Sequence, residues 1–226
     1  MIVCAIAALG LGYVVASAPF GPSSETFVKI APGTSTQAMA RQLENSGIIR
    51  SQYIFDALRL IKRGRLQAGE YRFDHPAPAA EVYARLVRGD VFTQSLTIPE
   101  GYNIFDIAQA VQAAGLGSAK AFLAAEMSHT ELVSEWDPQA VSLEGYLFPD
   151  TYRFPHSVTS LQILQAMVHR FKQVTSSLAP SNVAQTVTMA SLVEKEVAVD
   201  AERPLVAGVF VNRLAKNIPL ATDPTR

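Results

Sequence analysis

Two glutamates near the end of the chain, Glu194 and Glu196, have the side chains and the surroundings that acid–base chemistry needs. They lie in the stretch TMASLVEKEVAVDAER, residues 188–203, whose pattern predicts a helix. Positions three and four residues away share a helix face, and around both glutamates most of these are small or apolar. Apolar surroundings favour a protonated carboxyl, which can act as the general acid that glycoside cleavage requires. The alternative is a solvated surface glutamate, the usual state of this residue.

The composition predicts a folded protein that does not bind nucleic acid. With 226 residues, of which 49% are hydrophobic, the chain is long enough for one large domain or two small ones. The 19 basic and 20 acidic residues give a net charge of -1 and are spread without runs. Nucleic-acid binding leaves a basic patch, and this sequence has none.

The sequence predicts no metal site and no internal disulfide. Its single cysteine, Cys4, has no partner within the chain. No cysteine–histidine cluster has the spacing of a zinc site, because the histidines are scattered singly. They are His75, His129, His156 and His169.

The apolar run MIVCAIAALGLGYVVASA, residues 1–18, predicts a transmembrane anchor. It contains no charge, and its length reaches the lower limit for spanning a bilayer core of ~30 Å. A secretory signal would carry basic residues ahead of a shorter apolar region, although the closing Ala-Ser-Ala keeps a cleaved signal as an alternative. A buried soluble helix fits less well, because the run has two glycines and no polar face. Residues 19–25 follow as a linker.

The sequence pattern of residues 26–92 predicts a small α+β module. Residues 26–49 read as a short strand, a turn at Pro32-Gly33 and a helix that stops at Gly47. Three further elements are predicted: a helix over 52–62, a strand over 67–73 and a helix over 79–87.

An internal repeat at an offset of 68 residues, from Ile30 to Ile98, predicts a second small α+β module over residues 93–137. The alternative is coincidence within a common strand–turn–helix pattern. The matched pairs are Ile30 and Ile98, Gly33 and Gly101, Ala40 and Ala108, Leu43 and Val111, and Gly47 and Gly115.

The segment LEGYLFPDTYRF, residues 143–154, interleaves aromatic and hydrogen-bonding side chains. Aromatic faces beside polar groups suit sugar rings, and the same composition also suits the core of an ordinary hairpin. Glu144 and Tyr146 are therefore candidate substrate-binding residues, with core packing as the alternative. A long helix over 161–174 and a helix that begins at Pro204 complete the predicted elements.

Three segments together resemble the endolytic murein transglycosylase family of bacterial cell-wall enzymes. They are LEGYLFPDTY at residues 143–152, MASLVEKE at 189–196, and VNRL at 211–214 with TDPT at 222–225. The apolar N-terminal run and the AGEYRF strand of a small LysM-like module extend the resemblance over nearly the whole chain. The family's catalytic domain continues beyond the TDPT segment, so the resemblance implies that residues 138–226 form only its N-terminal part.

The resemblance also implies the chemistry. Members of the family cleave the bond between N-acetylmuramic acid (MurNAc) and N-acetylglucosamine (GlcNAc) without water and leave 1,6-anhydroMurNAc ends. Glu196, the second glutamate of the E-K-E triplet, would be the general acid and base, and no cofactor is required. Asn212, Thr222 and Asp223 lie in the matched motifs and are candidate ligands of sugar hydroxyls or acetamides, with cap or turn roles as alternatives. Glu194 points about 200° away on a helix of ~3.6 residues per turn, so a structural role is expected.

Together these observations predict an α+β protein with an N-terminal transmembrane helix, LysM-like modules and a mostly helical, incomplete catalytic domain. We expect it in the bacterial inner membrane as a single-pass protein whose globular part is extracytoplasmic. Its expected partners are peptidoglycan glycan strands and cell-wall synthases. The alternative is a membrane-anchored peptidoglycan-binding scaffold without catalysis. A third hypothesis is a hydrolase with two carboxylates on opposite sides of the bond.

Overall fold

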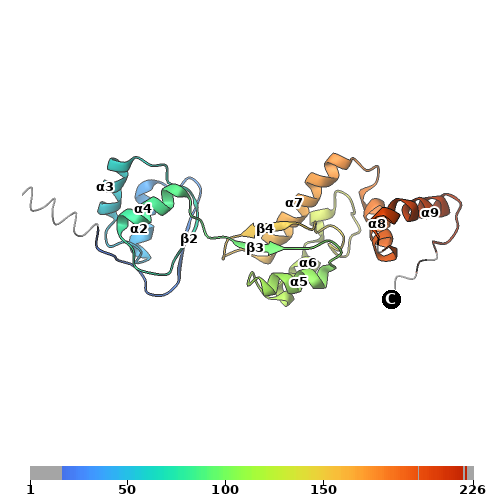
Figure 1. Ribbon diagram of the computed structural model, residues 1–226, viewed down its shortest axis with the longest axis horizontal. Helices are drawn as coiled ribbons and strands as arrows, with labels where there is room; N and C mark the ends of the chain where they lie inside the picture. The colour runs from blue at the N-terminus through green and yellow to red at the C-terminus, as the bar shows by residue number, and fades with distance from the viewer. Residues whose placement is uncertain (1–16, 198, 221, 223–226) are drawn as a thin grey trace, which may run out of the picture. The chain divides into compact units, whose positions relative to one another are not determined.

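The chain is a mixed α+β protein, mostly helical, and it divides into two compact units. The computed structural model describes residues 17–197, 199–220 and 222. Unit 1 is Met1–Thr93 and unit 2 is Gln94–Arg226 (Figure 1). The predicted anchor, residues 1–18, falls almost wholly outside the described residues. Within the described part of the chain, no helix combines the length and the apolar character needed to cross a membrane.

Unit 1 is built on a two-stranded antiparallel ladder that three helices cover. Strand β1 (Thr26–Ile30) pairs with β2 (Gly69–Phe73), with Thr26 opposite Phe73 and Ile30 opposite Gly69. The helices are α2 (Thr36–Asn45), α3 (Gln52–Lys62) and α4 (Ala79–Arg88). One residue of the predicted linker, Phe20, is part of this unit, because its backbone N–H and carbonyl exchange hydrogen bonds of 3.1 and 3.0 Å with Ala77.

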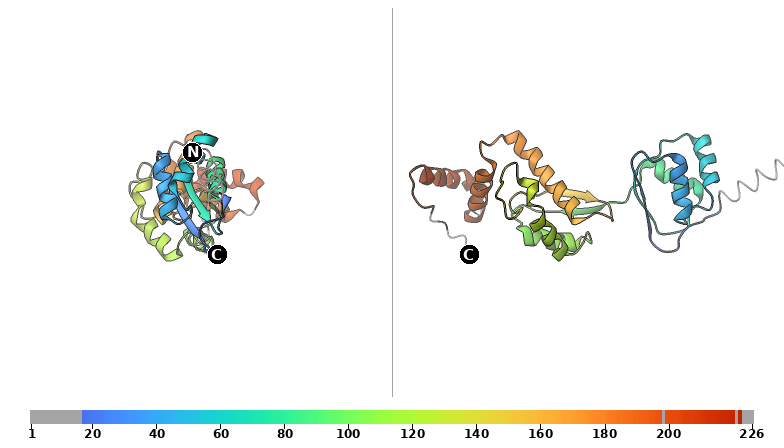
Figure 2. Two further views of the ribbon diagram at one scale, coloured as in Figure 1. Left: turned by 90° about the vertical axis from the view of Figure 1, so that its left-hand side faces the viewer. Right: turned by 180° about the vertical axis from the view of Figure 1, so that it is seen from behind.

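Unit 2 carries its own two-stranded ladder and the larger number of helices. Strand β3 (Gln94–Thr97) pairs antiparallel with β4 (Thr151–Phe154), and the paired residues Thr97 and Thr151 are 54 positions apart in the sequence. Figures 1 and 2 show α7 on one side of this ladder and α5 and α6 on the other. The other elements are α5 (Ile104–Ala113), α6 (Ala119–Ser128), η1 (Thr130–Val133), α7 (Ser160–Leu178), α8 (Val183–Glu196), η2 (Asp200–Glu202) and α9 (Arg203–Ala215).

The core of unit 2 crosses the boundary that the sequence analysis placed between residues 137 and 138. Ile107 and Phe122, from one side of that boundary, belong to the same buried cluster as Leu143 and Met167 from the other. The long-range β3–β4 pairing brings the two segments together, so residues 93–137 do not form a module with a separate core. Periodicity along the chain cannot predict such a pairing, because it depends on contacts distant in sequence.

The two copies of the internal repeat have the same backbone conformation at the strand–helix turn. Gly33 and Gly101 adopt φ values of 81° and 80°, a region that only glycine enters freely. Ser35 and Asn103 then cap the following helices with their side-chain oxygens. The matched core residues are fully buried in both copies: Ala40 with Ala108, and Leu43 with Val111.

The helix predicted over residues 188–203 is interrupted, which corrects the sequence analysis. Helix α8 ends at Glu196, and Val197 has extended backbone angles of φ -121° and ψ 120°. Its side chain is 6% exposed and packs in a small cluster with Val193 and Phe210. Burial of this β-branched residue against α9 thus favours an extended backbone over another helical turn.

We predict that Leu43→Ala destabilises unit 1 and leaves unit 2 unchanged, because each unit has its own core. Leu43 is 0% exposed, and truncation of such a leucine lowers the free energy of unfolding by about 2–5 kcal/mol. Hydrogen exchange measured by mass spectrometry reports the stability of each unit separately. Leu60→Ala is the control, because Leu60 on α3 is 76% exposed. Equal loss of protection in unit 2 would contradict the independence of the cores.

Candidate functional site

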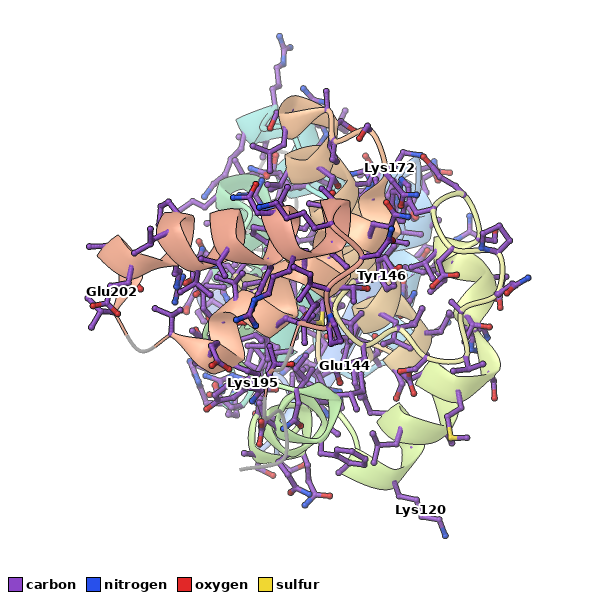
Figure 3. All side chains as sticks on the ribbon, turned by 90° about the vertical axis from the view of Figure 1, so that its right-hand side faces the viewer. Lys120, Glu144, Tyr146, Lys172, Lys195 and Glu202 are labelled. Atoms are coloured by element: carbon purple, nitrogen blue, oxygen red, sulfur yellow. The ribbon has the colours of Figure 1, made fainter. Side chains whose placement is uncertain are left out.

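An open cleft of about 1840 Å³ lies in unit 2. Three parts of the chain line it: the turn between β3 and α5, the segment that follows Leu143, and the helices α8 and α9. Figure 3 views the molecule from the α8 and α9 end, where Glu144 and Lys195 of the cleft are labelled. Ligand pockets usually measure about 300–1,000 Å³, so this cleft has room for an extended ligand.

The turn between β3 and α5 is fixed by a reciprocal set of hydrogen bonds at the start of α5. The Asn103 Oδ1 atom accepts from the Phe105 and Asp106 backbone N–H groups at 2.9 and 3.0 Å, and Asp106 Oδ2 accepts from the Asn103 N–H at 3.1 Å. Such a capping box satisfies donors that the first helical turn leaves free. It holds the Gly101 turn rigidly at the edge of the cleft.

Glu144 lies in the cleft, and its carboxylate also has a structural role. Its Oε2 atom accepts the backbone N–H of Ile104, the first residue of α5, at 2.7 Å. A carboxylate at a helix N-terminus is stabilised by the helix dipole and by the free N–H groups there. Glu144 therefore joins two walls of the cleft. The predicted substrate contact remains a prediction.

A buried carboxylate holds Glu144 in place. Glu126 on α6 is 3% exposed, and its Oε1 atom accepts from the Ser142 hydroxyl at 2.7 Å and the Leu143 N–H at 2.5 Å. The Ser142 oxygen in turn accepts the Glu144 N–H at 3.0 Å. This chain of bonds runs from the core to the cleft. The sequence analysis did not identify Glu126, because its apolar helical context gives no sign of these partners.

Tyr146 lies in the core and outside the cleft lining. It is 5% exposed, its ring stacks on Trp136 with 6.3 Å between centroids, and its hydroxyl donates to Asp137 Oδ2 at 3.3 Å. Burial, followed by the negative charge of Asp137, raises the pKa of Tyr146. Tyr146 thus packs in the core, which the sequence analysis gave as the alternative to substrate binding.

The E-K-E triplet meets the cleft through Glu194 and Lys195, whereas Glu196 is outside the lining. All three side chains are exposed. Glu194 and Val187 are seven residues apart and so share a face of α8. This face packs against two glycine turns: a Cβ at Gly101 would lie 3.4 Å from Glu194 Oε1, and a Cβ at Gly145 would lie 2.7 Å from Val187 Cγ1. Glu196 consequently points to another side, at the very end of α8.

Two of the other predicted substrate ligands, Asn212 and Thr222, lie apart from the cleft lining. Asn212 is exposed on α9, and Thr222 is half-buried beyond it. Neither lines the cleft. Asp223 is outside the described residues. The nearby Arg213 donates from Nη1 to the Leu220 carbonyl, which fastens the chain after α9 to that helix.

The cations of the cleft are Lys195 and Arg203. Arg203 pairs with Asp200 at 3.0 Å through Nη2, and its Nε atom is buried without a hydrogen-bond partner among the described residues. In that part of the chain no group of three or more histidine, cysteine, aspartate or glutamate side chains has the arrangement of a metal site. The groups that the cleft offers to a ligand are therefore carboxylates, cations, small polar side chains and apolar surface.

Unit 2 is thus a mostly helical α+β unit with a long cleft edged by carboxylates. Residues 28–226 match the model of the YceG-like family, and the chain belongs to this family. The resemblance that the sequence motifs predicted is confirmed at this level.

Two relatives carry the name endolytic murein transglycosylase. The protein of Streptococcus pneumoniae serotype 2 (strain D39) is 32% identical over 249 residues, which cover 95% of this chain and 45% of the relative. The Bacillus subtilis protein is 31% identical over 221 residues, covering 88% of this chain and 61% of the relative. The chain thus spans about half the length of these proteins.

A solved structure is similar as well. The crystal structure of a yceG-like protein from Listeria monocytogenes superposes with a TM-score of 0.51 and 27% sequence identity, over 90% of this chain and 74% of that one. The arrangement of elements in this chain is therefore shared with an experimentally determined member of the family.

Asp150, next to the cleft residue Pro149, has hydrogen-bond partners that favour its ionised form. Asp150 accepts the Thr151 N–H and the Arg170 Nε–H, each at 2.7 Å, and its backbone carbonyl accepts the Ile98 N–H at 3.0 Å. The backbone bond from Thr151, followed by the Arg170 guanidinium, lowers the pKa of Asp150 from its ordinary value of 3.8. Ionised Asp150 thus ties β4 to α7.

We predict that Asp150→Asn flattens the loss of stability that unit 2 shows on acidification. A lowered pKa in the folded state gives stability above the unfolded pKa, and this stability disappears as pH falls through the folded value. Urea unfolding between about pH 5 and pH 2 should therefore show a smaller loss in the variant than in the parent. Arg170→Gln should reduce this loss of stability less than Asp150→Asn does, because the hydrogen bond from the Thr151 N–H to Asp150 remains. Equal pH dependence in all three proteins would contradict the assignment.

Proposed function

We propose that this chain contributes the N-terminal part of the catalytic unit of an endolytic peptidoglycan lytic transglycosylase. The reaction is the cleavage of the MurNAc–GlcNAc bond without water, which leaves 1,6-anhydroMurNAc ends. The observation that carries the proposal is the position of the E-K-E triplet at the end of a helix that lines an open cleft of about 1840 Å³. Membership of the YceG-like family and the names of the two relatives support it.

In this proposal Glu196 acts twice. Its protonated carboxyl donates a proton to the glycosidic oxygen, the C1–O bond of MurNAc breaks, and GlcNAc leaves as an alcohol. The C6 hydroxyl of the same MurNAc then bonds to C1, and the Glu196 carboxylate takes up the hydroxyl proton. Atoms and charges balance without water or a cofactor, and the acid is regenerated.

The local structure supports a defined position for Glu196. It follows Lys195, which lines the cleft, and it precedes Val197, which is 6% exposed and anchored beside Phe210. The carboxyl group is therefore attached to a backbone that the packing of Val193 and Val197 holds in place. Its exposure leaves it accessible to a glycan strand that extends beyond the cleft.

The remaining parts of the proposal concern location. Residues 1–18 anchor the chain in the bacterial inner membrane, with both units outside the cytoplasm. Unit 1 serves as a LysM-like module that keeps the protein on the glycan, and the anchor brings it close to cell-wall synthases. The uncharged apolar run and the murein substrate support this arrangement.

A scaffold that binds peptidoglycan without cleaving it is the second candidate, and the two glycine turns of the repeat favour it. Gly33 in unit 1 and Gly101 in unit 2 both lie at the edges of cavities. A cavity at each turn, of about 650 Å³ in unit 1 and about 1840 Å³ in unit 2, would allow the chain to hold a strand at two points. Analysis of products from purified glycan strands separates the candidates, because only the transglycosylase generates anhydro ends.

We predict that Glu196→Gln lowers the rate of anhydro-end formation by at least about 10³-fold, near the upper part of the usual range for acid–base catalysis. Glutamine keeps the size of the side chain but cannot donate and recover a proton. The measurement is mass spectrometry of the ends that a protein with the whole catalytic domain releases from purified glycan strands. Glu202→Gln is the control, because Glu202 is also exposed and lies outside the cleft lining.

The outcomes of this experiment are distinct. Near-normal activity of Glu196→Gln would overturn the acid–base role of Glu196. Reducing ends in place of anhydro ends would indicate a hydrolase. A protein with the whole catalytic domain that binds strands and releases no ends would support the scaffold.

We predict that Ala8→Arg releases the protein from membranes, whereas Ser24→Arg does not. A charge within the apolar run raises the free energy of the membrane-inserted state, and a charge in the linker stays in water. Carbonate extraction of cell membranes, followed by detection of the chain in pellet and supernatant, is the measurement. Release of the parent chain into the supernatant would refute the anchor.

A further inference from the structure

An exposed tyrosine lies in the cleft at the turn that the internal repeat defines. Tyr102 follows Gly101, is 44% exposed and lines the cleft. The aromatic residue that the sequence analysis chose for sugar contact, Tyr146, is only 5% exposed. An aromatic face in water is a surface on which the C–H face of a pyranose ring can pack. Tyr102 is positioned for that contact.

A carboxylate lies close to the same glycine. Glu194 on α8 lines the cleft, and a Cβ at Gly101 would lie 3.4 Å from its Oε1 atom. Within the part of the chain that the structure describes, Glu194 has no hydrogen-bond or ion-pair partner. An ionised carboxylate only accepts hydrogen bonds, so its natural ligands are hydroxyl and amide N–H groups. An N-acetylated sugar carries both.

The other copy of the repeat shows that the turn does not itself require these side chains. Gly33 has the same φ as Gly101, 81° against 80°, yet a Cβ there would meet nothing within 4 Å. Thr34 occupies the position that corresponds to Tyr102. The aromatic ring and the carboxylate are therefore additions to the unit 2 turn, and both border the large cleft.

We propose that Tyr102 and Glu194, which both neighbour Gly101 in the cleft lining, form a subsite for one N-acetylated pyranose of the glycan. The Tyr102 ring packs against the sugar's C–H face, and the Glu194 carboxylate accepts hydrogen bonds from a ring hydroxyl or the acetamido N–H. This inference rests on the proposed glycan substrate and assigns binding residues within its site. Glu194 thus has a binding role, separate from the acid–base role of Glu196.

The subsite is tested with two pairs of matched variants. Tyr102→Ala and Glu194→Gln should each weaken binding by roughly three- to tenfold, in line with the loss of one aromatic contact or one charge-assisted hydrogen bond. Phe105→Ala and Glu202→Gln are the controls and should leave binding unchanged. Phe105 is 65% exposed at the start of α5, and neither control residue lines the cleft.

The probe is a soluble GlcNAc oligomer, with its deacetylated counterpart of equal length as comparison. Calorimetry on the whole chain gives the dissociation constants, and urea unfolding shows that each variant is folded. On glycan strands the same two variants should raise KM and leave kcat within about twofold, because they bind substrate without taking part in bond cleavage.

A third pair of variants serves as the control for backbone strain. Gly101→Ala and Gly47→Ala place the same residue at positive φ values of 80° and 68°, so they should lose similar stability, and Gly47 lines neither cavity. Only Gly101→Ala should weaken oligomer binding, because its methyl group meets the Glu194 carboxylate. Equal binding by both would argue against the subsite.

The results separate failure of the subsite from failure of the proposed reaction. Absence of anhydro ends with weakened oligomer binding in Tyr102→Ala and Glu194→Gln would reject the reaction and keep the subsite. Anhydro ends with unchanged binding and KM in both variants would keep the reaction and overturn the subsite. A fall in kcat at constant KM in Glu194→Gln would also overturn the binding role, because it would place this carboxyl in the chemical step.

Discussion

The cleft of unit 2 depends on one hydrogen bond, from the Ile104 N–H to the Glu144 carboxylate at 2.7 Å. This bond joins the first turn of α5 to the segment that follows Leu143, so it connects two walls of the cleft. The buried Glu126 carboxylate supports it through Ser142. Because a buried carboxylate that loses its partners is strongly destabilising, the geometry of this wall is tied to the stability of the core.

The repeat shows how one backbone design serves two units with different surroundings. In both copies a glycine with positive φ leads from a strand into a capped helix, and the matched core residues are fully buried. Only in unit 2 does a later helix, α8, pack against the turn. That contact makes the turn the edge of a large cleft and places Glu194 beside Gly101. A duplicated fold element thus acquires a different role from the elements added after it.

Local signals in the sequence predicted much of the fold. The helix over 52–62 has the bounds expected from its apolar face and flanking turns, and the strand that ends at Phe73 and the α4 helix are where periodicity placed them. The burial of Tyr146 and the end of α8 were not predictable in the same way. Tyr146 is buried because the rings of Trp136 and Phe171, from other segments, pack against it. Helix α8 ends where Val197 packs on Phe210 of α9. Periodicity reports the face of an element but not the partner that covers it.

The sequence by itself determined the family, because three motifs and their spacing can be recognised without any knowledge of tertiary contacts. It also determined the turn glycines, since a positive φ restricts the residue type at the position itself. The tertiary structure decided which carboxylate of the E-K-E triplet meets the cleft. Glu194 and Glu196 point about 200° apart on α8, and only the packing of that helix on two glycine turns selects the face that lies inward. A rotation of the helix is invisible in a sequence, because it is set by surfaces that meet only in the folded chain.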